Sequence, residues 1–248
     1  MRTHQLVLRW IEDQLSEGTL AVGGRLPAER SLAEQLAVSR TSVREAIRIL
    51  EAMGIVRAGV GSGPDAGTVV ISDPTAALGS ALRLHVATQH LPVADIVETR
   101  VLLESWAAAR AKPDAPELAR AAELLDDMDA DRGTDDFLAL DVQFHLALAD
   151  AAGNAVVSAM MGSLREAIQG YAEKMTANLS DWDATAARLR SEHREILEAI
   201  RKDDGSRAAR LVAAHIEGYY SEAGLGHDSR DPRDPAVMSR SVDRHGGT

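Results

Sequence analysis

The residues best suited to chemistry in this 248-residue chain are histidines that lie in apolar segments of its second half. Asp141 and His145 are four positions apart, so on a helix they share one face, and apolar residues one turn earlier make that face an inward one. His193 and His215 lie among leucine, isoleucine and valine in two later segments. One carboxylate and three imidazoles could bind a divalent metal. Taken singly, each histidine is more simply explained as a hydrogen-bonded core residue, and spacing alone leaves both explanations open.

A stripe of arginines near the N-terminus is a second candidate site, on a segment (39–53) with helical periodicity. Arg40, Arg44 and Arg48 follow one another at steps of four and share the face opposite an apolar stripe. Such a helix fits the major groove of DNA, where guanidinium groups contact guanine edges or phosphates. A small helical domain with a solvated arginine face explains the same stripe. Small hydroxyl residues fill the first turn: Ser39, Thr41 and Ser42.

The elements around this stripe predict a winged helix-turn-helix. The first 57 residues have the apolar periodicity of three helices, of which the second is expected over residues 31–37 behind a capping box. Two β-rich ends, 55–56 and 68–71, flank a glycine-rich loop and indicate a small β-hairpin. Pro74 ends the unit, because the residue before a proline avoids the helical region. We therefore expect a DNA-binding domain over residues 1–73.

The histidine-bearing segments belong to a long helical region. From about residue 76 to Gly224 the periodicity is helical, with breaks that predict about seven helices in an all-α antiparallel bundle. We expect a linker over 74–78, a helical domain over 79–224, and disorder in the polar tail 225–248. The fold class is therefore mainly α.

Composition restricts the classes of function. The chain has no cysteine, which excludes disulfides, thiolate zinc sites and cysteine nucleophiles. The sequence contains no stretch of 18 uncharged apolar residues, the length that a membrane-spanning helix needs. We therefore expect a cytoplasmic protein with no membrane partner. The net charge is −11, but the first 74 residues carry 8 arginines and 9 acidic residues, whereas the rest carries 19 basic and 29 acidic ones. The acidity therefore belongs to the C-terminal part and leaves the arginine stripe able to meet DNA.

Three motifs at fixed spacing resemble the winged helix-turn-helix of GntR-type transcription regulators: Leu26-Pro27-Ala28-Glu29-Arg30, then Ser39-Arg40-Thr41-Ser42-Val43-Arg44-Glu45-Ala46, then Gly54-Ile55-Val56. The resemblance implies that the partner is double-stranded operator DNA. The wing loop 61–67 is longer and more flexible than the commonest pattern, so its contacts stay open. The DNA-binding residues that the resemblance implies are Arg30, Ser39, Arg40, Ser42, Arg44 and, at the wing tip, Gly61. We add Thr41, a small hydrogen-bond donor of the first turn.

Four further pieces resemble the FCD effector-binding domain, the all-helical partner of the DNA-binding module in the FadR branch of GntR regulators. They are Glu98-Thr99-Arg100, Asp141-x-x-Phe144-His145, Glu192-His193 and His215. The resemblance implies that Asp141, His145, His193 and His215 bind a divalent metal, with Zn first and Ni, Mn, Fe or Co as alternatives. It also implies that Arg100 meets a carboxylate effector, and we place Asn154 as a polar residue of that pocket.

These expectations combine into a ligand-responsive transcription regulator, a dimeric repressor that senses a small organic acid at a metal site. A metal-dependent hydrolase or lyase is the alternative, because three histidines and an aspartate can hold a metal that activates water. No general base occurs at the spacing of an HExxH motif. Glu192 is adjacent to His193, but one adjacent acid is weak evidence for a general base. A third class, a pure protein-interaction module, would explain neither the arginine stripe nor the histidines.

Overall fold

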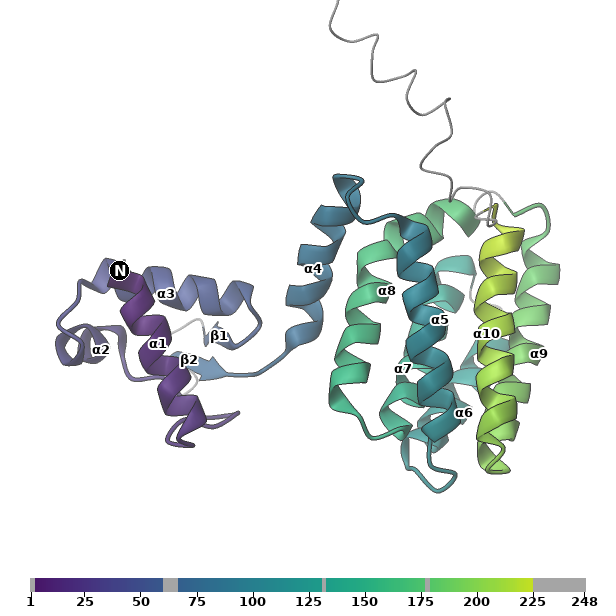
Figure 1. Ribbon diagram of the computed structural model, residues 1–248, viewed down its shortest axis with the longest axis horizontal. Helices are drawn as coiled ribbons and strands as arrows, with labels where there is room; N and C mark the ends of the chain where they lie inside the picture. Colours follow the sequence, from purple (N-terminus) through teal and green to yellow (C-terminus); the bar gives the residue numbers. More distant parts are fainter. Residues whose placement is uncertain (1–2, 60–66, 131–132, 177–178, 225–248) are drawn as a thin grey trace, which may run out of the picture. The chain divides into compact units, whose positions relative to one another are not determined.

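A computed structural model describes residues 3–59, 67–130, 133–176 and 179–224 (Figure 1). Within these ranges the chain forms ten helices and one two-stranded sheet, so the mainly α prediction is confirmed. Contacts divide the chain into two compact units. The first comprises the described parts of residues 1–90 with residues 158–167, and the second comprises the described parts of 91–157 and 168–248.

Three helices and a β-hairpin open the first unit. They pack around one apolar core, and the strands pair antiparallel from Val56↔Val70 to Gly59↔Gly67, which confirms the predicted hairpin. The connecting loop, with the predicted contact Gly61, lies outside the described residues. In chain order the elements are α1 (Thr3–Ser16), α2 (Glu29–Gln35), α3 (Arg40–Ala52), β1 (Val56–Gly59) and β2 (Gly67–Val70).

Helix α2 begins and ends earlier than the sequence predicts. It starts at Glu29 after an extended Ala28 that makes no side-chain cap, so Ser31 lies inside the first turn and is not a capping residue. It ends before Ala37, whose positive φ of 52° takes the chain out of the helical conformation. The capping-box prediction was therefore wrong, although the helix itself is present.

Seven helices follow the hairpin. The residues predicted as a linker, 74–78, are the start of α4, with proline at its first position. The predicted tail, 225–248, lies outside the described residues. The helices are α4 (Pro74–Ala87), α5 (Val93–Arg110), α6 (Glu117–Asp129), α7 (Thr134–Ala151), α8 (Ala155–Thr176), α9 (Trp182–Arg201) and α10 (Gly205–Glu222).

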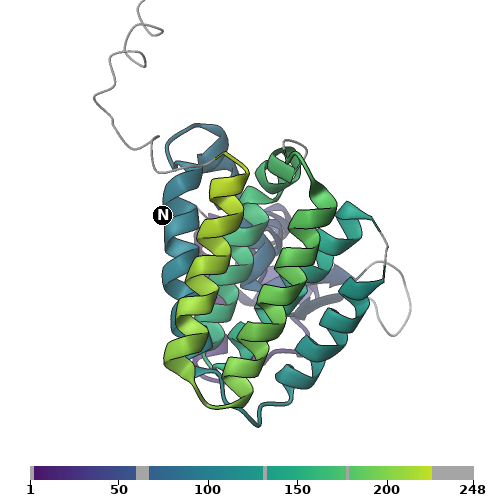
Figure 2. The same cartoon turned by 90° about the vertical axis from the view of Figure 1, so that its right-hand side faces the viewer.

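The second unit is built on packed pairs of helices. Helix α10 packs against α5 and α9, α7 against α5 and α6, and α6 also against α9. Figure 2 shows α9 and α10 side by side along their length. No helix in the described ranges has the length and apolar character that a membrane crossing requires. The apolar core includes Leu124, Phe144, Leu148, Leu189, Ile196 and Ile216.

The turn between α3 and the hairpin depends on Gly54. Its φ of 70° follows the C-cap of α3, and its carbonyl accepts a hydrogen bond from the amide of Asp73 at 2.7 Å. A Cβ at Gly54 would overlap the carbonyl oxygen of Asp73. Glycine is therefore required here both by the backbone angle and by the close approach of a second chain segment.

We expect Gly54→Ala to lower the free energy of unfolding by about 2–5 kcal/mol. The left-handed backbone contributes about 1–2 kcal/mol of that loss and the overlap about 1–3 kcal/mol. Urea denaturation followed by circular dichroism measures it. Gly18→Ala is the matched control, because Gly18 has a φ of 73° with nothing within 4 Å of the added Cβ. Equal losses in the two variants would contradict the steric argument.

Candidate metal centre and nucleic-acid interface

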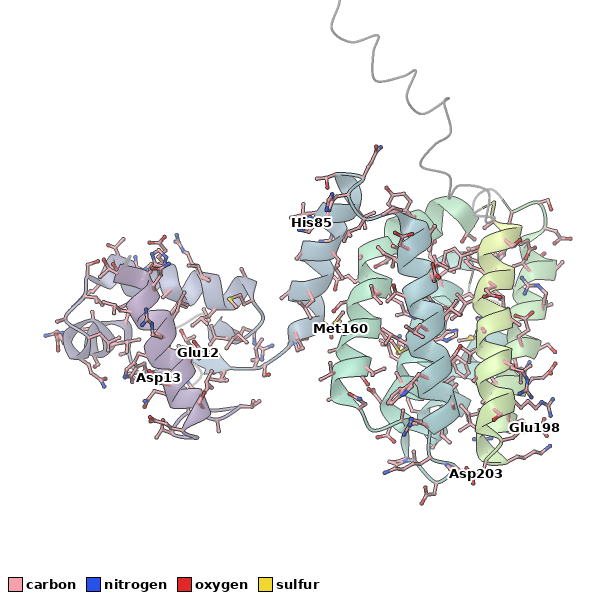
Figure 3. The ribbon with its side chains drawn as sticks, in the orientation of Figure 1. Glu12, Asp13, His85, Met160, Glu198 and Asp203 are labelled. Atoms are coloured by element: carbon pink, nitrogen blue, oxygen red, sulfur yellow. The ribbon has the colours of Figure 1, made fainter. Side chains whose placement is uncertain are left out.

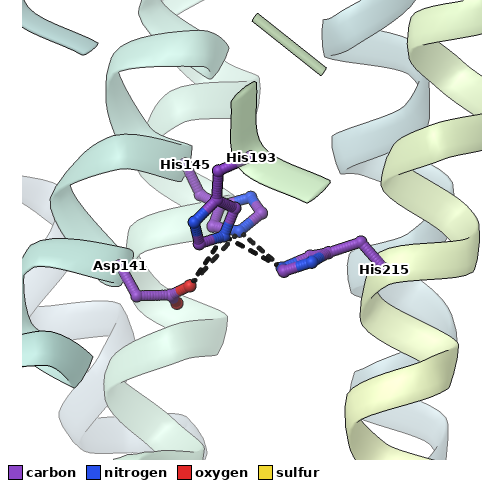
Figure 4. Close-up of side chains that lie close together, drawn as sticks. All are labelled: Asp141, His145, His193 and His215. Atoms are coloured by element: carbon purple, nitrogen blue, oxygen red, sulfur yellow. Dashed lines mark hydrogen bonds and ion pairs between the residues drawn. The ribbon is translucent and has the colours of Figure 1, made fainter. Parts of the chain in front are cut away.

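The three histidines and the aspartate that the sequence singles out lie together in the second unit (Figure 4). Helix α7 supplies Asp141 and His145, α9 supplies His193 and α10 supplies His215. All three imidazoles are buried, and the ring of His193 packs on Phe144 with 4.6 Å between centroids. Each histidine shares a helix face with core residues, which is why folding the apolar faces together also brings the imidazoles together.

The four side chains converge through one atom each. Nε2 of His215 lies 3.2 Å from Nε2 of both His145 and His193. Oδ1 of Asp141 lies 3.1 Å from Nε2 of His193 and 3.6 Å from Nε2 of His145. The donor atoms all lie within 4.8 Å of one another. We call these four residues the cage.

The chemistry of the cage fits a divalent metal. Nδ1 of His145 lies 2.8 Å from a carboxylate oxygen of Glu104, and Nδ1 of His215 lies 2.8 Å from one of Glu192. A carboxylate only accepts hydrogen bonds, so these Nδ1 atoms donate and the Nε2 atoms present lone pairs to one another. Metal–nitrogen bonds of ~2.1 Å place neighbouring ligand nitrogens roughly 3.0–3.4 Å apart, as they are here. Nitrogen and carboxylate donors suit Zn, Ni, Co, Mn or Fe(II).

Burial keeps two of the imidazoles in the form that binds metal. It lowers the pKa of His193 to about 3, and the neighbouring His215 adds to this effect. Burial also lowers the pKa of His215. Although burial opposes it, hydrogen bonds from His215 and Arg188 hold the pKa of Glu192 below its usual value. At neutral pH His193 and His215 are therefore neutral, with an ionised carboxylate behind His215.

Five of the predicted DNA-binding residues lie at the start of α3. Ser39 is the N-cap, and its Oγ accepts from the amide of Ser42 at 3.1 Å. Arg40, Thr41 and Arg44 are exposed, whereas the opposite face of α3 is buried in the core. The two-faced helix that the sequence predicts is therefore present, with an uncovered cationic face and amides at its N-terminus.

Acidic residues of α2 hold two of the predicted DNA-contacting arginines. Nη2 of Arg44 lies 3.0 Å from Oε2 of Glu29, and Nε of Arg30 lies 2.9 Å from Oε1 of Glu34. The hydrogen bond to Glu29 raises the pKa of Arg44. Both pairs are exposed to water and therefore weak, so phosphate oxygens can replace the carboxylates.

Comparison with known proteins matches both halves of the chain. Residues 4–64 match the family described as bacterial regulatory proteins, gntR family, and residues 95–218 match the FCD domain. The chain belongs to the GntR family of regulators and carries an FCD domain. The resemblance identified in the sequence is thereby confirmed.

Similar proteins agree with this assignment. The HTH-type transcriptional regulator LutR of Bacillus subtilis is 29% identical over 84% of this chain and 98% of its own length. A putative L-lactate dehydrogenase operon regulatory protein of Escherichia coli K12 is 30% identical over 82% of this chain and 79% of its own length. The solved structure of a Streptococcus agalactiae GntR is 29% identical, with a TM-score of 0.62 over 87% of this chain and 97% of that one. These are transcription regulators and not enzymes, so the hydrolase or lyase alternative is set aside.

Within the FCD domain, Arg100 is connected to the cage by Glu104, a residue that no sequence motif identified. Its Nε donates to Oε1 of Glu104 at 2.8 Å, and its Nη1 donates to the hydroxyl of Tyr220 at 2.6 Å. The four-residue spacing of Arg100 and Glu104 was a signal of an ion pair. Contact between Glu104 and His145 depends on how α5 packs against α7, which no local pattern encodes.

Asn154, the other predicted effector residue, caps α8. Its Oδ1 accepts from the amides of Val156 at 3.1 Å and Val157 at 3.2 Å. These two bonds satisfy donors that every helix start leaves open. Its role in effector binding stays a prediction.

We expect the metal-free FCD domain to lose stability as the pH falls below about 6.5. In the unfolded chain the histidines titrate near that value, whereas burial in the folded state lowers the pKa values of His193 and His215. The unfolded state thus binds more protons, and the free energy of unfolding falls by up to ~1.4 kcal/mol per pH unit for each of these two histidines as the pH drops below about 6.5. Urea denaturation with a chelator between roughly pH 7.5 and pH 4 measures this slope.

The control for this slope separates buried from exposed histidines. His193→Gln is expected to make the pH dependence shallower, because it removes a proton-binding difference between the two states. His85→Gln changes an exposed histidine, labelled in Figure 3, and is expected to keep the wild-type slope. An unchanged slope in His193→Gln would contradict the assignment.

Proposed function

We propose that this GntR-family regulator is a ligand-responsive repressor in the cytoplasm that binds operator DNA as a homodimer and senses a small organic acid. The effector site in this proposal is a divalent metal, Zn in the first place, held by Asp141, His145, His193 and His215. The observation that carries the proposal is the convergence of these four donor atoms within 4.8 Å. A bound metal would supply a Lewis acid with positions open to oxygen ligands.

The charges around the cage favour an anionic effector. Glu104 is paired with Arg100 and Glu192 with Arg188, and Asp141 is the one carboxylate among the four cage residues. A divalent ion at the cage is then only half neutralised by Asp141, and a carboxylate ligand supplies the remaining negative charge. In this proposal Arg100, which is paired with Glu104 behind His145, also binds an outer oxygen of that ligand.

The chemical class of the effector follows from the same geometry. A hydroxy acid can bind a metal through its carboxylate and the adjacent hydroxyl oxygen, which suits the open positions beside four protein ligands. One relative is named for the L-lactate dehydrogenase operon. L-Lactate is therefore the first hydroxy acid to test. Its binding would shift the bundle helices and, through the residues between the two family domains, reset the DNA-binding units of a dimer.

We expect the protein purified without chelator to carry about one divalent ion per chain, and His193→Ala to lose it, because that variant removes a cage ligand. Elemental analysis measures the metal content. In a thermal-shift assay, L-lactate is expected to raise the melting temperature of the metal-loaded wild type and not of His193→Ala. Glu198→Gln, at an exposed position of α9 labelled in Figure 3, is the control and should keep the metal. A wild-type protein without stoichiometric metal would overturn the metal site.

We expect Arg40→Ala and Arg44→Ala each to weaken specific DNA binding by roughly 1–3 kcal/mol, because both side chains project from the exposed face of α3. Fluorescence anisotropy with a duplex selected by the wild-type protein from a random library measures the loss. Arg120→Ala is the control, since Arg120 is an exposed arginine of α6 in the other unit. Undiminished affinity in both test variants would contradict the proposal that α3 binds in the major groove.

A further inference from the structure

Two glutamates outside the ligand set stand behind two of the cage histidines. Glu104 accepts from Nδ1 of His145 with Oε2 and from Nε of Arg100 with Oε1, both at 2.8 Å. Glu192 accepts from Nδ1 of His215 with Oε2 at 2.8 Å and from Nη1 of Arg188 with Oε1 at 2.7 Å. In both cases the arginine precedes its glutamate by four positions on one helix, and the histidine comes from another helix.

The third histidine has no such support. Nδ1 of His193 is buried without a hydrogen-bond partner among the described residues. Its Nε2 faces Asp141 at 3.1 Å and His215 at 3.2 Å. The cage therefore has two imidazoles whose outer nitrogen is held by a carboxylate and one whose outer nitrogen is not.

We propose that Glu104 and Glu192 are positioning residues that fix the tautomers of His145 and His215, so that both present an Nε2 lone pair to the cage before any metal arrives. Glu104 fixes its histidine more firmly, because its side chain is 2% exposed, whereas that of Glu192 is 30% exposed and water can compete for its partners. Each arginine donates to the other oxygen of its glutamate and so aligns the carboxylate with the histidine. In His193 the carboxylate of Asp141 faces Nε2 at 3.1 Å, so no carboxylate holds a proton on its Nδ1.

Glutamine at either position distinguishes this role from simple packing. A carboxylate offers two acceptors, whereas the amide offers one acceptor and one donor of nearly the same shape. Arg100 can only donate, so the amide oxygen stays with it and the NH₂ group faces Nδ1 of His145. That nitrogen must then accept, and the proton of the neutral ring moves to Nε2, where it blocks the lone pair that a metal needs.

The first test measures tautomers directly and needs no metal. The probe is the long-range ¹H–¹⁵N correlation spectrum of the histidine rings in ¹⁵N-histidine-labelled, metal-free protein, which has eight histidines. We expect Glu104→Gln to exchange the Nδ1–H pattern of one ring for the Nε2–H pattern, and Glu192→Gln to shift a different ring partly in the same direction. Each variant serves as the control for the histidine that the other one changes.

The outcome that overturns the inference is a Glu104→Gln protein with a wild-type circular dichroism spectrum and no changed ring. If Glu104→Gln does not fold, the half-exposed Glu192→Gln carries the same test, and wild-type patterns at every ring overturn it. Because this inference rests on the proposed metal site, a wild-type protein that binds no metal would refute that site. The tautomer result would still be decided by the spectrum alone.

The second test measures metal affinity in the full-length chain. Competition of Co²⁺ and Zn²⁺ with a chromophoric chelator should show a 10–100-fold loss for Glu104→Gln, a smaller loss for Glu192→Gln and none for Glu198→Gln. The Co²⁺ absorption spectrum of Glu104→Gln should also change, since one imidazole no longer binds in the same way. Wild-type affinity together with a wild-type Co²⁺ spectrum in Glu104→Gln would overturn the positioning role.

Discussion

Three buried imidazoles whose inner nitrogens face one another form the interaction on which the rest of this protein depends. Two of the Nε2–Nε2 separations are 3.2 Å, and lone pairs at that distance repel unless a proton or a cation lies between them. The apolar faces of α7, α9 and α10 hold the rings there, because separating the rings would expose the surrounding core to water. The helical bundle thus maintains an arrangement that a positive ion would relieve.

The charged residues behind the cage histidines form arginine–glutamate ion pairs. Arg100 and Arg188 each neutralise a glutamate that supports a histidine, so the buried carboxylates are not left without compensation. Asp141 differs from both glutamates because it faces the inner nitrogens and not the outer ones. This division separates a residue suited to binding an ion from residues suited to orienting its ligands.

The DNA-binding unit uses opposite faces of one helix for two tasks. The apolar face of α3 packs against α1 and α2, while the other face carries arginines that no part of the core could accept. Glu29 and Glu34 hold two of the arginines of this unit from exposed positions, where an ion pair is weak enough to exchange for phosphate. Membership in the GntR family makes the chain a DNA-binding regulator, and the match to the FCD domain covers the residues of the cage.

The sequence by itself determined which helices form, since the 3.6-residue repeat of apolar positions specifies an inward face, and it identified the aspartate and histidines on such faces. Its motifs also identified the family. Only tertiary structure decided that Glu104, on a helix without a ligand, supports His145, and that Glu192 supports His215 although it is adjacent to His193. It also decided that residues 74–78 continue as helix and that α2 begins at Glu29. The reason is physical: periodicity is set by local geometry, whereas the partner of a buried polar atom is set by how separate helices pack.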